Sequence, residues 1–445
     1  MRQTLCYIPE TLFGLPFFGW GLGLGLLVAI VAIVHGYQYL RRGTVGDVGG
    51  SLALLGIGGV MLVFIVPNLA EPGRGVPIRG YGSGLLVAIL AAFLLLLRLA
   101  KRQGIAPETV YSLALWSVVT GIIGARLFYV TEYWRETFLD HSGHILPLGD
   151  LLFRLLNVAG GGLVVLGSIL GGTLGAFIFM HRNKMPVLRT FDVMAPALML
   201  GIAIGRIGCL LNGCCFGGVT DVSWGIVFPA GSPAHARQVA HGDVFLYGMK
   251  FDEVSVAGRT LLAVAEVQPG SEAETCGLKP NMVLWSIAGQ LDGEPIAGQP
   301  QHRWQAMELL LDFRRTTPES KLQFDFLPAP PERELVTHSL APSHSEVLPV
   351  HPTQIYSSGL ALLLCGTLLV LGRLRFYQQR AGLVFASFMV LYSVGRFCME
   401  MVRADEDSFF GTGLTVSQNV SIVVCLAGTV LFVSVCKRFS NNLVQ

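Results

Sequence analysis

Long apolar segments constrain this chain more than any other feature of its sequence. A bilayer core takes about 20 mainly apolar residues per spanning helix, because lipid offers no partner to an unpaired backbone group. The segments predict an all-α polytopic membrane protein, in agreement with a composition of 52% hydrophobic and 13% charged residues. We count nine candidate transmembrane helices, at residues 12–39, 49–70, 81–99, 110–133, 160–180, 191–211, 356–371, 381–401 and 414–435.

The Lys and Arg residues between these spans predict an orientation, because short cytoplasmic loops retain positive charge. Thirteen of them fall on one side of the membrane and six on the other. With nine spans, this alternation places the N-terminus outside and the C-terminus in the cytoplasm. The net charge of +2, without a basic stripe, indicates no nucleic-acid partner.

A polar stretch at residues 219–350 interrupts the apolar pattern, with nine Lys/Arg and sixteen Asp/Glu. Its charge predicts a water-soluble insertion, and the expected orientation places it on the outer face. We expect a small α+β unit followed by a tether at 328–349 that is rich in Pro, Ser and His. The expected elements are strands at 261–267, 282–287 and 321–327 and a helix at 303–313.

The middle of the insertion resembles a PDZ domain. Residues 269–280 read PGSEAETCGLKP between two expected strands, as in the short PDZ helix that follows a strand. The resemblance covers about 250–328 and implies capture of an extended peptide partner by strand addition. A spacer domain with a degenerate groove is the alternative.

The expected domains are 1–76 with two N-terminal spans, 77–240 and 351–445 as the membrane core, 241–328 as the PDZ-like insertion, and 329–350 as its linker.

Ionisable groups inside the apolar spans are candidates for function, because charge at membrane depth is costly. Arg126, Arg206, Arg396 and Glu400 have this placement, and the last two are one helical turn apart. Three guanidinium groups against one carboxylate leave positive charge for an anion. An anionic lipid headgroup at the outer leaflet would accept bidentate hydrogen bonds from arginine. The alternative is structural, with Arg396 paired to Glu400 and the other two arginines bonded to helix-end carbonyls.

The residues around Arg206 carry a resemblance to a known family. Residues 205–217 read GRIGCLLNGCCFG, which resembles the signature of prolipoprotein diacylglyceryl transferases. Further matches follow in the family's order between residues 77 and 435, the insertion apart. They are IRGYG (78–82), GAR (124–126), GGL (161–163) with GG (171–172), WG (224–225) with FP (228–229), HPTQIY (351–356), Arg396 with Glu400, Arg403 and Asp405, and GLT (413–415) with Gln418.

The resemblance implies an enzyme of the bacterial cytoplasmic (inner) membrane. Its expected reaction transfers the diacylglyceryl group of phosphatidylglycerol to the lipobox cysteine thiol of prolipoproteins, the first step of lipoprotein maturation. Breaking the bond to phosphate requires positive groups that stabilise the departing anion, and attack requires a thiolate. The excess positive charge in the spans agrees with the first requirement.

Roles in this reaction follow from the charges in the spans and from the resemblance. Arg206 and Arg396 are assigned to the headgroup phosphate, and Glu400 is expected to orient Arg396. The base that accepts the cysteine proton stays open among Tyr81, Glu400 and His351, and helix capping is an equal alternative for His351. The groups expected to bind phosphatidylglycerol are Arg126, Arg206, Arg396, Asn212 and Gly217, with Tyr81 as a further positioning group.

Two departures from the family pattern bear on the chemistry. Leu166 stands where some members have a histidine, so a mechanism based on that histidine does not suit this chain. Cys209 and Cys214 stand where the signature often has Asn and Glu, although a cysteine variant also belongs to the pattern. Adjacent Cys214 and Cys215 lack a paired CxxC or histidine set with zinc spacing, so we expect no metal and no cofactor. We interpret these three cysteines as small residues at a glycine-rich bend.

Two other classes of protein compete with a transferase. A site-2-type membrane protease also carries an inserted PDZ domain, but it needs a zinc-binding HExxH motif. No His-Glu pair occurs in the sequence, which makes this class less suitable. A non-catalytic lipid-binding scaffold would keep the fold and recruit partners through the PDZ-like unit. Diacylglyceryl transfer to a lipobox peptide distinguishes the enzyme from the scaffold.

Overall fold

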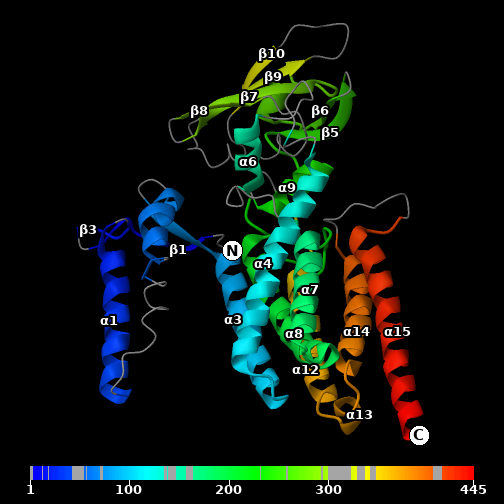
Figure 1. The fold of residues 1–445 in the computed structure, drawn as a ribbon. Coiled ribbons are helices and arrows are strands. Elements are labelled where there is room, and N and C mark those ends of the chain that lie inside the picture. Colours follow the sequence, from blue (N-terminus) through cyan, green and yellow to red (C-terminus); the bar gives the residue numbers. More distant parts are fainter. Residues whose placement is uncertain are drawn as a thin grey trace. The chain divides into compact units, whose positions relative to one another are not determined.

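The computed structural model is mostly helical, with one larger sheet (Figure 1). The chain divides into two compact units. The first comprises Met1–Leu86, Ile204–Tyr356 and Val402–Asp407, and the second comprises Val87–Ala203, Ser357–Met401 and Ser408–Gln445. The structure describes residues 4–42 except 13 and 19, 55–70 except 57, 74–134, 138, 147–156, 164–256 except 231, 259–291, 294–298, 322–327, 336–340, 347–403 and 413–444.

Six helices among the described residues are long and apolar enough to cross a membrane, which confirms a polytopic membrane protein. Each overlaps one of the nine predicted spans. The six helices are α3 (Gly80–Arg102), α4 (Pro107–Glu132), α8 (Val187–Asn212), α12 (Thr353–Leu371), α14 (Leu383–Glu400) and α15 (Val416–Val444).

Of the other three predicted spans, the first begins later than predicted, and the second and fifth are described only in part. The first was expected to begin at residue 12, but β2 (Thr11–Leu12) and β3 (Leu15–Pro16) form a hairpin there. The glycine in its turn, Gly14, has a φ of 79°, which a glycine adopts without strain. Helix α1 (Leu22–Arg42) therefore starts later, and its apolar part is shorter than the six spans. In the second span, η1 (Met61–Ile65) and η2 (Val66–Leu69) are described. The fifth becomes α7 (Val165–Arg182), with residues 157–163 outside the described part.

Glycines bring two helices of the second unit together, where α4 and α7 run side by side (Figure 1). A Cβ on Gly124 would lie 2.4 Å from the Gly167 carbonyl oxygen and 2.8 Å from the Cα of Gly171. Small residues let helix backbones approach this closely, which gains dispersion contacts in a medium without a hydrophobic driving force. The glycine-rich sequence of α7 is therefore a packing surface toward α4.

A carboxylate within α8 caps another helix of the second unit. Asp192 accepts hydrogen bonds from the backbone N–H groups of Gly382 (2.6 Å) and Phe385 (2.8 Å), at the start of α14. A negative group is favourable at a helix N-terminus, where N–H groups lack partners within the helix. Asp192 carries no recognisable signal in the sequence, because its partner lies about 190 residues further along the chain.

The insertion forms an antiparallel sheet in the first unit, in the order β10-β9-β7-β6-β5, with β8 also paired to β7. The three predicted strands are confirmed as parts of β6, β7 and β9. The expected helix at 303–313 lies outside the described residues. The strands are β5 (Met249–Val256), β6 (Arg259–Val267), β7 (Val283–Leu291), β8 (Glu294–Gly298), β9 (Leu322–Leu327) and β10 (Val336–Leu340).

The core of this sheet extends beyond residues 250–328, the range of the PDZ resemblance. Phe324 and Phe326 alternate along β9 and are fully buried, as expected for one face of a strand. The same core includes Val239 from α9 (Pro233–His241), together with Leu246 from the segment after it. Strand β10 lies within the stretch predicted to be a tether, so that prediction is wrong for residues 336–340. Backbone pairing with β9 outweighs the Pro- and Ser-rich composition of the flanking residues.

Candidate functional site

Two glycines bring α3 and α8 into contact in the first unit. A Cβ on Gly84 would lie 2.7 Å from the Cα of Gly208, so the two backbones touch at this crossing. Tyr81 lies one turn before Gly84, and Arg206 lies two residues before Gly208. The two side chains consequently come close enough to interact electrostatically. Tyr81 remains 43% exposed and is accessible to a ligand.

Helix α8 ends in a left-handed bend that contains the second half of the signature. Gly213 has a φ of 77°, and its N–H donates to the Cys209 carbonyl at 2.9 Å, as at many glycine-terminated helices. Cys215 has a φ of 58°, a conformation that a residue with a side chain rarely adopts. Surrounding contacts must hold such a residue in place, and functional sites often contain one.

The first residues of α12 hold this bend. Thr353 Oγ1 donates to the carbonyl of Cys215 at 2.6 Å, and Gln354 Nε2 donates to the carbonyl of Cys214 at 2.7 Å. Both donors are buried, with Gln354 fully so. Breaking either bond would leave a buried polar group without a partner, which costs about 1–3 kcal/mol. The strained backbone at Cys215 is thus fixed by side chains from a distant part of the sequence.

Backbone pairing joins three chain segments next to the bend. Gly217 N–H donates to the His351 carbonyl at 2.9 Å, and Gly218 N–H donates to the Val402 carbonyl at 3.1 Å. A Cβ on Gly217 would lie 2.6 Å from the Cβ of His351 and 2.9 Å from the Val402 oxygen. Only glycine fits this position without displacing its neighbours. The Gly217 that the sequence assigned to lipid binding therefore also has a packing role.

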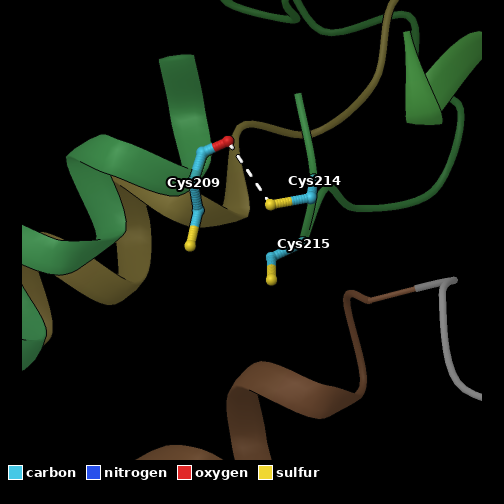
Figure 2. Close-up of side chains that lie close together, drawn as sticks. All are labelled: Cys209, Cys214 and Cys215. Carbon is cyan, nitrogen blue, oxygen red and sulfur yellow. Dashed lines mark hydrogen bonds between the residues drawn. The ribbon is translucent and has the colours of Figure 1, made fainter. Parts of the chain in front are cut away.

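The bend gathers three thiols, which Figure 2 shows at the end of α8. The sulfur atoms of Cys209, Cys214 and Cys215 all lie within 4.8 Å of one another, and the three residues are partly buried. The Cys214 thiol donates to the Cys209 carbonyl at 3.7 Å. Hydrogen bonds from the Cys209 and Cys214 thiols lower the pKa of Cys215, and the charges of Arg206 and Arg403 lower it further. The interpretation of these cysteines as small bend residues missed their grouping, which arises only when the chain turns back.

His351 belongs to a polar and aromatic cluster in the same unit. Its Nδ1 lies 3.5 Å from the hydroxyl oxygen of Tyr356, and that oxygen accepts a hydrogen bond from Trp224 Nε1 at 2.6 Å. The ring is partly buried, and its backbone takes part in the pairing with Gly217. These contacts give His351 a structural role next to the bend, and its role as a base stays a prediction.

In the second unit, Arg396 and Glu400 form the ion pair predicted from their spacing on α14. The Arg396 side chain is 15% exposed, and that of Glu400 is 1% exposed. Arg396 Nη2 also donates to Ser417 Oγ on α15 at 2.8 Å. The ion pair agrees with the positioning role expected of Glu400 and equally with the structural alternative in which Arg396 pairs with Glu400, so the assignment of Arg396 to the headgroup phosphate stays a prediction. The contact with Ser417 carried no signal in the sequence analysis.

Arg126 binds the end of a short helix in the second unit. Its Nε donates to the Leu155 carbonyl at 3.0 Å, and its Nη2 donates to the Arg154 carbonyl. Both acceptors belong to the last turn of α6 (Leu148–Leu156), whose carbonyls lack partners within the helix. The guanidinium also lies 5.0 Å from the centroid of the Tyr129 ring. These contacts match the structural alternative for Arg126, and its assignment to lipid binding stays a prediction.

The predicted site residues thus fall into two described groups. The first unit contains Tyr81, Arg206, Asn212, Gly217 and His351, gathered around the end of α8 and the segments paired with it. Arg396, Glu400 and Arg126 belong to the second unit. The charged residues were predictable because charge is conspicuous in an apolar span. The roles of Thr353 and Gln354 were not predictable, because their bonds to the bend depend on folding.

These features define a polytopic membrane protein with guanidinium groups and clustered thiols near the ends of its spanning helices. The family model for prolipoprotein diacylglyceryl transferase matches residues 68–278 and 287–434. The chain is 34% identical to a phosphatidylglycerol–prolipoprotein diacylglyceryl transferase of Rhodopirellula baltica, over 97% of this chain and 88% of that protein. It is also 36% identical to transferases of the same description from Clostridium perfringens, over 36% of this chain and 59% of the relative, and from Synechococcus elongatus, over 37% and 52%. The chain belongs to the prolipoprotein diacylglyceryl transferase family, and it is a multi-pass inner-membrane protein.

Proposed function

We propose that this protein transfers the diacylglyceryl group of phosphatidylglycerol to the lipobox cysteine thiol of prolipoproteins. In this reaction the sulfur attacks the glyceryl carbon, and the bond from that carbon to the phosphate oxygen breaks. A thioether forms, and glycerol phosphate leaves as an anion. A protein that catalyses this step must hold the leaving phosphate with positive groups and must receive a thiolate nucleophile.

Arg206 is the observation that carries the proposal. It lies on a spanning helix beside the strained bend of the family signature, and no carboxylate is within ion-pair distance of it among the residues that the structure describes. A guanidinium in that position is available to an anionic ligand, and its planar fork suits phosphate oxygens. Asn212, at the end of the same helix, and Tyr81, across the glycine crossing, are the proposed polar positioning groups.

Arg396 is the second proposed phosphate donor. Its ion pair with Glu400 and its bond to Ser417 support a guanidinium that is oriented before the substrate arrives. Glu400 is engaged by this ion pair, which favours an orienting role over that of a free base. Tyr81 and His351 are the other candidate bases that the sequence left open.

The proposed topology has nine spans, with the N-terminus and the insertion outside and the C-terminus in the cytoplasm. It rests on the unequal distribution of Lys and Arg between alternate loops. In this orientation the end of α8 faces the outer leaflet, where a lipobox peptide arrives after export. The insertion is proposed to act as a PDZ-like unit that binds a peptide partner, with a spacer role as the alternative.

One assay separates the enzyme from a lipid-binding scaffold. Purified protein in nanodiscs that contain phosphatidylglycerol is incubated with a synthetic lipobox peptide, and the product is measured by mass spectrometry. We expect the peptide mass to increase by one diacylglyceryl group, and a peptide with Ser in place of the lipobox Cys should stay unmodified. An unchanged Cys peptide in correctly folded preparations would favour the scaffold.

A further inference from the structure

The three thiols at the end of α8 have the spacing of a metal site. Ligands at the usual Zn–S distance of about 2.3 Å lie about 3.8 Å apart in a tetrahedral arrangement. The sulfur atoms of Cys209, Cys214 and Cys215 already lie within 4.8 Å of one another. Small side-chain rotations would therefore bring all three onto one ion, and Figure 2 shows them at one bend of the chain.

Hydrogen bonds hold the backbone that carries these thiols. Cys214 N–H donates to the Cys209 carbonyl at 3.2 Å, which closes the turn between the first two ligands. Thr353 and Gln354 hold the carbonyls of Cys215 and Cys214. Cys215 itself has a left-handed φ, a strained conformation that persists only where surrounding contacts hold it. Metal sites depend on such outer hydrogen bonds to orient their ligands.

The charges near the thiols also suit a thiolate site. Three thiolates and one divalent cation have a net charge of −1, and a fourth thiolate makes the net charge −2. Arg206 lies three residues before Cys209 on α8, and Arg403 pairs with Gly217, two residues after Cys215, so both guanidinium groups would balance this charge. A disulfide between two of the cysteines would leave the third thiol without a function and would need no positive neighbours.

We propose that Cys209, Cys214 and Cys215 bind a thiophilic divalent ion, of which Zn²⁺ is the representative, and that its fourth position receives the substrate thiol. Three protein ligands with one open position are the arrangement of catalytic zinc sites. This inference rests on the proposed function, because the incoming ligand is the lipobox cysteine. It also answers the open question of the base, since a thiol that coordinates zinc loses its proton outright.

The reaction balances without an oxidant or a reductant. The lipobox thiol loses its proton to water when its sulfur binds the ion. The sulfur then attacks the glyceryl carbon of phosphatidylglycerol and forms the carbon–sulfur bond. The carbon–oxygen bond to phosphate breaks, its electron pair stays on the phosphate oxygen, and Arg206 stabilises that oxygen. The thioether product is a weaker ligand than a thiolate, so it leaves the ion.

Metal binding is tested first, with the reduced full-length protein in nanodiscs. We expect about one zinc per chain by elemental analysis. Cys209→Ser, Cys214→Ser and Cys215→Ser should each lose most of this zinc, whereas Cys436→Ser on α15 should retain it. Cys214→His, which supplies another zinc ligand, should keep zinc even if a serine variant folds poorly. No zinc in the reduced wild type, equal zinc in all variants, or a disulfide among the three cysteines in protein isolated without reductant would overturn the proposal.

The open position is tested with Co²⁺ as a spectroscopic probe. Cobalt in the site should show sulfur-to-metal charge-transfer absorption, and a lipobox peptide should increase that absorption by about a third as a fourth thiolate binds. The same peptide with Ser in place of Cys should leave the spectrum unchanged. A cobalt spectrum that does not respond to the Cys peptide would refute a substrate-binding metal.

Activity separates failure of this inference from failure of the proposed function. Removal of zinc by a chelator should lower diacylglyceryl transfer at least tenfold, and added Zn²⁺ should restore it. Undiminished transfer by zinc-free protein would overturn the metal site and leave the transferase function intact. If neither zinc-loaded nor zinc-free protein transfers the group, the proposed function fails, and the response of the cobalt spectrum to the Cys peptide still decides the metal site.

Discussion

Arginine and lysine carry the same charge but differ in the geometry of their hydrogen-bond donors. Replacing Arg206 or Arg396 by lysine tests whether this geometry matters for transfer. In Arg206→Lys and Arg396→Lys the charge remains, but the planar fork that can bind two phosphate oxygens is lost. Loss of such a transition-state contact costs about 3 kcal/mol, so transfer per folded molecule should fall about a hundredfold. Initial rates with a lipobox peptide would measure this effect. Near-normal turnover in both variants would remove the phosphate assignment.

Arg126→Lys distinguishes the two interpretations of Arg126. A lysine cannot reproduce both bonds to the carbonyls at the end of α6. If Arg126 is a structural anchor, the variant should lower the yield and the thermal midpoint of the folded protein more than its turnover. If Arg126 instead binds phosphatidylglycerol, the Michaelis constant for the lipid should rise while the thermal midpoint stays near that of the wild type.

Gly217, next to the bend, has no room for a larger side chain. A methyl group in Gly217→Ala would collide with His351, Thr353 and the Val402 carbonyl at 2.6–2.9 Å. Overpacking of this kind costs about 1–3 kcal/mol, so we expect a lower thermal midpoint and reduced transfer. Gly366→Ala on α12 is the matched control, because a Cβ there meets no atom within 4 Å. A similar thermal midpoint for both variants would contradict the close packing around Gly217.

At the scale of elements, the insertion is the part whose removal is most informative. Leu246 belongs to its core and β10 to its sheet, so the unit to replace by a flexible linker is residues 243–346 rather than the predicted 250–328. Transfer to a short lipobox peptide should remain largely intact, because the proposed site lies outside these residues. The rate with a full-length prolipoprotein would show whether the insertion recruits substrate. Complete loss of transfer to the short peptide by a folded deletion protein would place part of the active site in the insertion.

The elements differ in how far the sequence predicts them. Six spans were predictable because about 20 apolar residues have few other stable arrangements, and the strand predicted at 321–327 corresponds to β9 (Leu322–Leu327). The hairpin before α1 was not predicted, because its apolar residues continue the hydrophobic pattern of the helix. Strand β10 was not predicted either, since only its pairing with β9 makes it a strand.

The candidate site was predictable only in part. Arg206, Arg396 and Glu400 stood out because each is a charge in an apolar span, and the pairing of the last two follows from helical spacing. The thiol cluster was hidden, because residues 209, 214 and 215 have no familiar metal spacing until Gly213 turns the chain. The donors Thr353 and Gln354 lie about 140 residues from their acceptors, a distance over which sequence pattern has no predictive value.

At the scale of the whole molecule, the proposed orientation makes a prediction about access. A cysteine introduced as Ser345→Cys should react with a membrane-impermeant thiol reagent in intact spheroplasts, since the tether is expected on the outer face. The background is a variant whose exposed native cysteines, Cys6 and Cys398, are replaced by serine. A cysteine at Arg182, in a loop expected in the cytoplasm, should react only after lysis. The opposite labelling pattern would reverse the topology.

The insertion leaves and rejoins the rest of the first unit through a short paired stem. Ile226 and Val350 exchange backbone hydrogen bonds at 3.0 Å, and Thr220 N–H donates to the Pro349 carbonyl at 3.0 Å. The two connection points therefore stay adjacent whatever lies between them, and the entropy of closing a longer loop grows only slowly with its length. The stem is therefore a suitable position for inserting another domain. A reporter or binding domain whose two termini lie close together could replace residues 243–346 without changes to the membrane-spanning helices.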